Sequence, residues 1–416
     1  MNILKFFTAG SVDDGKSTLI GRLLYDTDSI LADQLEALQQ SNRKNDDGTI
    51  DLAILTDGLR AEREQGITID VAYKYFQTDK RKFIIADTPG HIQYTRNMVT
   101  GASTAKLAII LVDARNGVVE QTIRHSYLVS LLGIEHVVVC LNKMDMVGYS
   151  ETVYDAITDK YKALAIELGL KDVTFIPVSA LKGDNVVNES EHMPWYQGRS
   201  LLHFLETVDV ESGPEYNLAR MPVQWVIRPQ TDELHDYRGY AGRILSGSFN
   251  VNDHVTVLPS GTSSVIERIE IFNQQPAEAF AGQSVTLHLK DNIDISRGDV
   301  LVNSDHLPQT SQLIEADVCW MDARPLDESI TYLLQHNSKV TKCKIRDIVY
   351  KVDINTLEKQ EAFDFKLNDI GRVVLKTAEA LAFDFYTENK ANGAAILIDS
   401  RTNLTAAALM FRAVAD

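Results

Sequence analysis

Gly10-Ser11-Val12-Asp13-Asp14-Gly15-Lys16-Ser17 is the stretch around which the rest of the chain is organised. It satisfies G-x-x-x-x-G-K-[ST], the pattern of a loop that wraps the phosphates of a nucleoside triphosphate. Residues 3–7 before it read as a short buried strand, and leucine and isoleucine recur at helical spacing over 19–24. The motif therefore has the strand–loop–helix context that phosphate binding requires, and the alternative is a chance match.

Each residue type in this loop has a physical task. Gly10 and Gly15 allow backbone angles that let successive amide N–H groups turn toward an anion. The helix that begins near Lys16 adds partial positive charge at its first turn. The Lys16 ammonium can reach the β- and γ-phosphates, and the Ser17 hydroxyl can bind Mg²⁺.

A second motif follows the predicted buried strand 82–86, which ends in Asp87-Thr88-Pro89-Gly90-His91. A strand that ends in aspartate places a carboxylate at the carboxyl edge of a parallel sheet, beside the phosphate loop. We expect Asp87 to hold Mg²⁺ through water and the Gly90 N–H to meet the γ-phosphate. Taken alone, this motif is also a common turn at the end of a strand.

A third motif, Asn142-Lys143-Met144-Asp145, ends the predicted strand 137–141. The Asp145 carboxylate can accept from both N1–H and the 2-amino group of guanine, and adenine lacks these donors. Asn142 can reach the other edge of the base, while the Lys143 stem lies along the ring. Taken alone, the motif is also typical of a helix-capping turn. After strand 174–178, a backbone N–H of Ser179-Ala180-Leu181 can donate to guanine O6.

These motifs predict one binding site for GTP or GDP with Mg²⁺. Its nucleotide-binding residues are Gly10, Ser11, Val12, Asp13, Asp14, Gly15, Lys16, Ser17, Thr18, Asp87, Thr88, Pro89, Gly90, His91, Asn142, Lys143, Met144, Asp145, Ser179, Ala180 and Leu181.

Composition limits the class of protein. The 416 residues carry a formal net charge of −17, which repels nucleic-acid backbones, so no nucleic-acid partner is expected. No apolar run is long enough for a membrane span, and the N-terminus enters a strand without room for a signal peptide. Cys140, Cys319 and Cys343 lack metal-ligand spacing, which favours a reducing, cytoplasmic location.

The predicted fold class is an α/β P-loop GTPase domain with a doubly wound, mostly parallel sheet, followed by two all-β barrels. The GTPase domain spans 1–208, and a polar linker with Gly213 and Pro214 spans 209–221. Beyond it, short alternating strands predict barrels at 222–303 and 313–416, the last predicted strand being Ala394 to Ile398. Amphipathic stretches 30–38 and 52–63 predict further helices.

This arrangement resembles the translation-factor class of GTPases, which includes elongation factor Tu. The resemblance implies that His91 orients the attacking water and that Thr68, in Gly66-Ile67-Thr68-Ile69, binds Mg²⁺ when GTP is present. The catalytic residues that it implies are His91, Lys16 and Thr68, and the metal ligands are Ser17, Thr68 and Asp87. Val12 and Ile67 match an apolar pair that gates the access of His91 to the γ-phosphate.

Within this class, longer segments are similar to the GTPase large subunit (CysN) family of bacterial sulfate adenylyltransferase. These segments are residues 10–17, 62–73, 93–98, 237–242 and 294–299. The resemblance implies a hetero-oligomer with a small catalytic, CysD-like subunit that forms adenosine 5′-phosphosulfate from ATP and sulfate. Ile92 departs from the glutamate usual in this family, and the expected absence of a second phosphate loop implies no fused adenylylsulfate kinase.

Two alternatives belong to other functional classes. One is a translation factor that delivers aminoacyl-tRNA to ribosomes, which the acidic charge and the segment 237–242 disfavour. The other is a GTP-dependent scaffold without a role in sulfur metabolism. Binding of charged tRNA would favour the first alternative, and sulfate-dependent pyrophosphate release would argue against both.

Overall fold

The computed structural model describes residues 2–30, 52, 70–90, 94–210, 218–229 and 237–415. The chain divides into unit 1, Met1–Gly213 with Ile354–Thr356, and unit 2, Pro214–Asp353 with Leu357–Asp416. Except for Ile30 and Leu52, the predicted helical stretches 30–38 and 52–63 lie outside the described residues. So do the predicted site residues Thr68 and His91.

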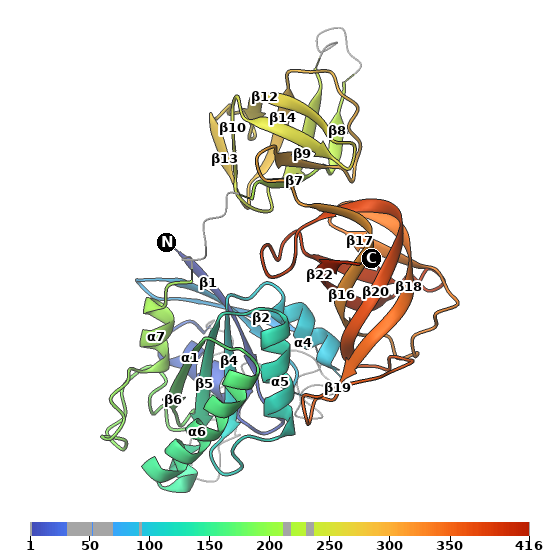
Figure 1. Ribbon diagram of the computed structural model, residues 1–416. Coiled ribbons are helices and arrows are strands. Elements are labelled where there is room, and N and C mark those ends of the chain that lie inside the picture. Colours follow the sequence, from blue (N-terminus) through green and yellow to red (C-terminus); the bar gives the residue numbers. More distant parts are fainter. Residues whose placement is uncertain are drawn as a thin grey trace. The chain divides into compact units, whose positions relative to one another are not determined.

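Unit 1 is built on a sheet of six described strands in the order β2-β3-β1-β4-β5-β6 (Figure 1). The strands are β1 (Ile3–Ala9), β2 (Ala72–Gln77), β3 (Lys82–Asp87), β4 (Leu107–Asp113), β5 (His136–Asn142) and β6 (Asp172–Pro177). Only the edge strand β2 runs antiparallel to its neighbour within this described sheet. The predicted mostly parallel sheet is confirmed.

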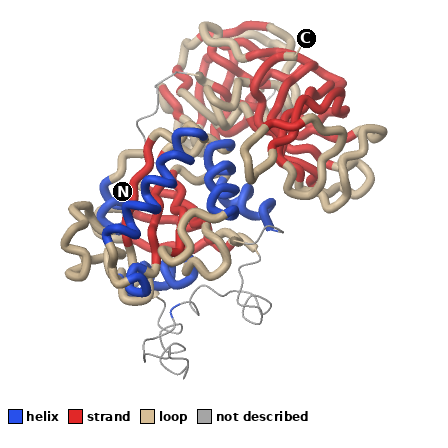
Figure 2. The backbone as a smooth tube through the Cα atoms, turned by 60° about the horizontal axis from the view of Figure 1, so that its bottom comes forward, coloured by secondary structure: helices blue, strands red, loops and turns tan. Residues whose placement is uncertain are grey.

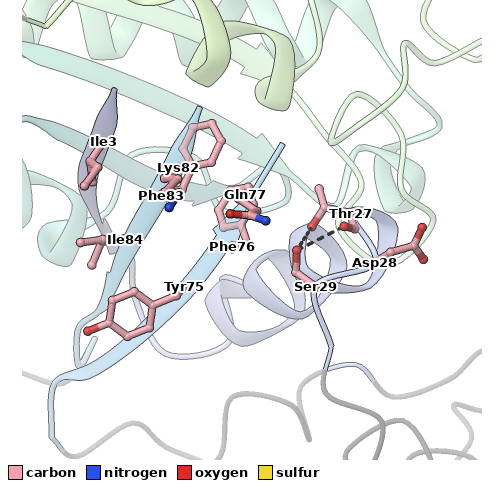
Figure 3. Close-up of a pocket in the computed structure, with 10 residues that line it drawn as sticks. All are labelled: Ile3, Thr27, Asp28, Ser29, Tyr75, Phe76, Gln77, Lys82, Phe83 and Ile84. Carbon is pink, nitrogen blue, oxygen red and sulfur yellow. Dashed lines mark hydrogen bonds between the residues drawn. The ribbon is translucent and has the colours of Figure 1, made fainter. Parts of the chain in front are cut away.

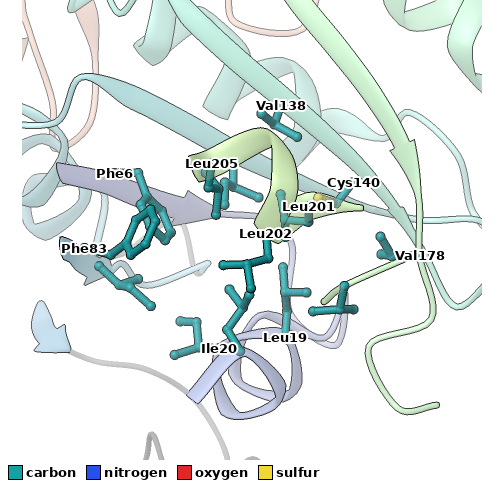
Figure 4. Packing of buried hydrophobic residues seen from close by; sticks show 14 of the residues in the cluster. Phe6, Leu19, Ile20, Phe83, Val138, Cys140, Val178, Leu201, Leu202 and Leu205 are labelled. Carbon is teal, nitrogen blue, oxygen red and sulfur yellow. The ribbon is translucent and has the colours of Figure 1, made fainter. Parts of the chain in front are cut away.

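Helices lie on both faces of this sheet (Figure 2). They are α1 (Lys16–Asp26), α4 (Thr95–Ala102), α5 (Glu120–Leu131), α6 (Glu151–Glu167) and α7 (Leu201–Thr207), with a short 3₁₀ helix at Met144–Val147. On one face, the leucines of α1 and α7 pack with Phe6 and Phe83 of the sheet (Figure 4). This apolar core fixes α1 against β1, and therefore fixes the loop between them.

The first barrel of unit 2 comes from short strands in the order β7-β15-β11-β12-β14-β9-β8. They are β7 (Arg220–Pro222), β8 (Trp225–Ile227), β9 (Gly239–Arg243), β11 (His254–Leu258), β12 (Thr262–Glu270), β14 (Ser284–Leu289) and β15 (Val300–Asn303). A separate pair joins β10 (Ser248–Asn250) to β13 (Glu278–Phe280). Because β7 pairs with β15 and β8 pairs with β9, the segment 220–227 brings the two ends of the sheet together.

The second barrel closes through longer strands. They are β16 (Gln309–Trp320), β17 (Tyr332–His336), β18 (Lys339–Val352), β19 (Lys359–Gln360), β20 (Ile370–Phe383), β21 (Ala394–Ile398) and β22 (Thr405–Val414). The order β17-β21-β22-β16-β20-β18 returns to β17, so six strands form a closed barrel and β19 extends β18. The predicted order of one doubly wound α/β domain followed by two β-barrels is confirmed.

The sequence analysis did not predict β22. Its sequence TAAALMFRAV is rich in alanine, which is depleted in strands, and so it lacks a clear strand pattern. In the structure it pairs with β16 on one side and with β21 on the other. The long-range pairing of β22 therefore overrides its local preference.

The two barrels meet at a buried ion pair within unit 2. Arg220 donates from Nε and Nη2 to the two carboxylate oxygens of Asp384, at 3.0 and 2.9 Å. Asn389 and Asn392 each donate a further hydrogen bond of 3.0 Å to Asp384. Ala382 packs beside this joint in an apolar cluster with three residues of the first barrel, Leu258, Val300 and Val302.

Candidate nucleotide-binding site

The carboxyl ends of the parallel strands of unit 1 gather the predicted motifs at one edge of the sheet. The phosphate loop follows β1, Thr88-Pro89-Gly90 follows β3, the Asn142 motif ends β5, and Ser179 lies shortly after β6. Hydrogen bonds and close approaches connect each motif to the next. These described site residues, far apart in the sequence, therefore form one cluster.

The phosphate loop has the backbone geometry that its glycines allow. Gly15, directly before α1, has φ +91° in the left-handed region, and a Cβ there would lie 2.4 Å from Asn142 Nδ2. Asp13 has φ +66°. The Asp14 carboxylate accepts a hydrogen bond of 2.5 Å from the backbone N–H of Ser11. Side chains of the loop thus hold its turned conformation from within.

Lys16 is drawn into the loop. Its ammonium donates to the carbonyl oxygens of Gly10 at 2.8 Å and of Ser11 at 3.0 Å. Burial lowers the pKa of Lys16, and the nearby carboxylates of Asp87 and Asp14 oppose that change. A phosphate group is a suitable partner for this cation, because its negatively charged oxygens accept charge-assisted hydrogen bonds from an ammonium that, among the described residues, donates only to backbone carbonyls of the loop. Ser17 and Thr18 lie in the first turn of α1 and are partly exposed.

Gly90 lies against the phosphate loop. A Cβ at this position would come within 2.4 Å of the Gly10 carbonyl oxygen and 2.5 Å of Lys16 Nζ. Only glycine therefore fits here without displacing the loop backbone. The preceding Thr88 donates from its hydroxyl to the Thr8 carbonyl oxygen at 2.6 Å, which ties β3 to β1 beside the loop.

Asp87 ends β3 and is almost fully buried. The Thr8 hydroxyl lies 3.4 Å from its carboxylate. A carboxylate and a serine hydroxyl are hard oxygen ligands of the type that Mg²⁺ prefers. Asp87 and Ser17 thus supply suitable donor chemistry for a magnesium ion.

The Asn142 side chain links three motifs. Its Nδ2 donates to the Asp14 carbonyl oxygen at 2.7 Å, and its Oδ1 accepts from the Ala180 N–H at 2.9 Å. The next residue, Lys143, has φ +64°, and its ammonium donates to the Asp13 carbonyl oxygen. The loop that follows β5 is therefore anchored to both the phosphate loop and the Ser179 loop.

Asp145 is held by a neighbouring hydroxyl. Ser179 Oγ donates to Asp145 Oδ1 at 2.7 Å, and the side chain of the preceding Met144 is fully buried. One carboxylate oxygen has this fixed partner, and the side chain is partly exposed. Such a carboxylate is positioned to accept hydrogen bonds from neighbouring N–H donors, as guanine offers.

The sequence analysis did not identify two charged residues, Arg22 and Asp113, that contact these loops. Arg22 of α1 donates to the carbonyl oxygens of Ala180 at 3.2 Å and Leu181 at 2.5 Å. Asp113 ends β4 and binds both Arg115 and Lys143. Asp113 could have been found by the rule applied to Asp87, because it too ends a buried strand of the sheet.

A hollow of about 620 Å³ lies away from this cluster (Figure 3). Its lining includes Ile3 and Lys82, at the amino ends of β1 and β3, and Thr27 directly after α1. The phosphate loop is at the opposite ends of these strands. This hollow is therefore separate from the candidate nucleotide site.

Two features bear on other ligands and on membranes. Among the described residues, no group of three or more His, Cys, Asp or Glu side chains could hold a metal ion by itself. No helix in the described ranges combines the length and the apolar character needed to cross a membrane.

Two family models match this chain and agree with this architecture. The elongation factor Tu GTP-binding domain family matches residues 1–224, and the GTP-eEF1A C-terminal domain-like family matches residues 313–411. Among solved structures, sup35 complexed with GMPPNP is 23% identical with a TM-score of 0.45, covering 100% of this chain and 95% of that chain.

Curated relatives are more similar. Sulfate adenylyltransferase subunit 1 of Bacteroides fragilis is 53% identical over 98% of this chain and 85% of the relative. The protein of the same name from Aliarcobacter butzleri is 51% identical over 99% of this chain and 87% of the relative. The bifunctional enzyme CysN/CysC of Mycobacterium tuberculosis is 52% identical over 98% of this chain and 67% of the relative. The chain therefore belongs to the sulfate adenylyltransferase subunit 1 (CysN) family, whose GTPase domain is of the elongation factor Tu type.

Proposed function

We propose that this chain is the GTP-hydrolysing regulatory subunit of a sulfate adenylyltransferase, in which a separate catalytic subunit forms adenosine 5′-phosphosulfate from ATP and sulfate. The observation that carries the proposal is the clustering of the phosphate loop, Gly90 and the Asn142–Asp145 segment at one sheet edge. The high similarity to subunit 1 relatives supports the sulfate-activating role.

The chain's own residues account for nucleotide binding. Amides of the loop 10–18 and the Lys16 ammonium bind the phosphates, while Gly90 leaves room and directs its N–H toward the terminal phosphate. Asn142 and Asp145 bind the edges of guanine, with the Lys143 stem along its face. An adenine base in this position would leave the Asp145 carboxylate without its donors, which costs on the order of a few kcal/mol.

Ser17, Asp87 and Thr68 are the residues that would hold Mg²⁺. When bound, this ion neutralises charge that develops on the phosphates. Lys16 adds a fixed positive charge, and His91 orients the attacking water. We propose that the segments around Thr68 and Gly90 change their order with the state of the terminal phosphate, as nucleotide switches do.

The proposed coupling has a thermodynamic reason. Formation of a phosphoric–sulfuric anhydride from ATP and sulfate is steeply uphill, so an additional free-energy source is needed. We propose that GTP hydrolysis in the domain 1–208 supplies it by conformational coupling to a small, CysD-like catalytic subunit in a cytoplasmic hetero-oligomer. In the proposed domain division, a linker at 209–221 follows the GTPase domain, and the two barrels span 222–303 and 313–416.

Reconstitution with the small subunit tests this function. The chain should co-purify with an ATP-binding partner, and GTP should stimulate sulfate-dependent release of pyrophosphate from ATP. His91→Ala should leave GTP affinity nearly unchanged and slow hydrolysis at least about 100-fold. Pyrophosphate release that is indifferent to GTP would contradict the coupling, and GTP-dependent binding of charged tRNA would favour a translation factor instead.

A further inference from the structure

The carboxyl end of β4 carries a charge cluster to which the proposed function gives no task. Its centre is Asp113, which is 2% exposed and lies in register with Asn142 of β5. Lys143 Nζ lies 2.9 Å from Asp113 Oδ2. Arg115 contacts the same carboxylate from Nη2 at 2.6 Å and Nε at 3.0 Å, and its backbone N–H donates at 2.9 Å.

These contacts fix the end of a flexible side chain. The Lys143 ammonium is bound both by the Asp113 carboxylate and by the Asp13 carbonyl oxygen. Lys143 has its own backbone in the left-handed region, next to Asn142. A four-carbon stem tethered at both ends has few remaining rotamers, so little conformational freedom is lost when a ring is placed against it.

We infer that Asp113 is a positioning residue for guanine recognition: its carboxylate holds the Lys143 ammonium, so that the Lys143 stem lies ready along the face of the base. This inference rests on the proposed role of Asn142–Asp145 in guanine binding. Asp113 acts through Lys143 and need not touch the nucleotide.

The electrostatics of the cluster support a charged Asp113. Burial alone would raise the pKa of its carboxyl, but hydrogen bonds from Arg115 and Lys143 together lower it to about 2. Asp113 therefore carries its negative charge throughout the neutral range. Arg115 binds both oxygens of this carboxylate, with Nε on Oδ1 and Nη2 on the same Oδ2 that Lys143 contacts, and these bonds fix the orientation of Asp113 toward Lys143.

This role has a specific signature. Asp145 distinguishes bases by their edge, since the 2-amino group is present in guanine and absent from hypoxanthine. The Lys143 stem contacts the face, which is nearly the same in both bases. Loss of Asp113 should therefore lower the affinities for GDP and inosine diphosphate by the same factor. Loss of the Asp145 carboxylate should lower the affinity for GDP more than that for inosine diphosphate.

The experiment measures GDP and inosine diphosphate affinity in Asp113→Asn, Lys143→Ala and the double variant. We expect Asp113→Asn to lower the affinity for both nucleotides about 10-fold. Adding Asp113→Asn to Lys143→Ala should change neither affinity further. Asp159→Asn is the matched control, because Asp159 forms an exposed ion pair with Lys162 on α6 and should have wild-type affinity.

Three results would overturn the inference: unchanged affinities in Asp113→Asn, a further loss in the double variant, or a changed ratio of GDP to inosine diphosphate affinity. Asp113→Glu retains the charge if Asp113→Asn does not fold. It should bind both nucleotides more tightly than Lys143→Ala does, and an affinity no better than that of Lys143→Ala would count against the role. A wild-type chain that binds neither nucleotide would overturn the proposed function itself.

Discussion

The nucleotide edge of unit 1 and the joint between the barrels of unit 2 both bury charged groups, but they do so differently. At the joint, Arg220 and Asp384 are 1% and 4% exposed, and Asp384 accepts four hydrogen bonds from side chains. At the nucleotide edge, Asp13, Gly15 and Lys143 have positive φ, and two of them are not glycine.

The difference separates a structural contact from a candidate binding site. The joint satisfies its charges internally, so nothing in its geometry calls for a ligand. The nucleotide edge places a lysine among backbone carbonyls, uses glycine where a Cβ cannot fit, and holds unusual backbone angles. Strain of this kind persists where the surrounding structure over-determines it, and it is concentrated at functional sites.

The largest expected effect breaks the joint. Arg220→Met removes one partner and leaves the Asp384 carboxylate buried, so we expect the free energy of unfolding of unit 2 to fall by about 3–5 kcal/mol. Urea unfolding, followed by the fluorescence of the buried Trp320 with the other tryptophans replaced by phenylalanine, measures this.

Arg346→Met is the control for the joint. Arg346 and Asp347 form an exposed pair in the same unit, so this change should cost less than about 1 kcal/mol. GTP affinity should be unchanged in both variants. An equal loss of unfolding free energy in the two variants would show that the buried ion pair stabilises unit 2 no more than the exposed pair does.

The next effect is at the nucleotide edge. Gly90→Ala places a methyl group against the Gly10 carbonyl oxygen and Lys16 Nζ, and overpacking of this kind costs about 1–3 kcal/mol. We expect GTP affinity, measured by titration with a fluorescent analogue, to fall about 30-fold. Gly169→Asn is the control, because Gly169 has φ +67°, which asparagine tolerates, and a Cβ there would have no neighbouring atom within 4 Å. Affinity equal to the wild type in Gly90→Ala would contradict the close approach.

A smaller effect is expected from the hydroxyl that holds Asp145. Ser179→Ala removes the hydrogen bond of 2.7 Å and leaves the carboxylate less fixed, which should cost about 1 kcal/mol, or about fivefold in GDP affinity. Ser190→Ala removes a similar bond to Asp184 in the same unit and should leave GDP affinity unchanged. Calorimetric titration of both variants decides whether the position of Asp145 matters.

The smallest expected effect is on the pH dependence of the free energy of unfolding, through His336 near the joint. Burial lowers the pKa of His336 to about 4, so the unfolded chain takes up this proton first as the pH falls below about 6.5. The contribution of the neutral His336 to the free energy of unfolding is therefore fully present above that pH. It decreases at lower pH, by about 1 kcal/mol between pH 7 and pH 5.5. His336→Gln should flatten this dependence in urea unfolding, and His254→Gln, at an exposed site, should not. An unchanged slope in His336→Gln would refute the assignment.

The sequence was most informative where chemistry restricts the residue type. The phosphate loop, Gly90 and the Asn142–Asp145 segment each need particular residues at fixed spacing, and strand ends placed all three at one edge. Strand β22 was missed because its alanine-rich sequence has no local strand preference and depends on pairing with β16 and β21. Arg22 was missed because a single charged residue on a helix has no motif, and Asp113 was missed because the rule applied to Asp87 at the end of β3 was not applied to the end of β4.

The sequence by itself determined the order of the α/β domain and the two barrels, the residues that must be glycine in the site, and the chemistry that each loop offers. Tertiary structure decided which loops contact one another. It sets Asn142 between Asp14 and Ala180, Asp113 against Lys143, and Arg220 against Asp384. The physical reason is that hydrogen-bonded pairs far apart in sequence depend on strand order and register, which local patterns of residue type do not encode.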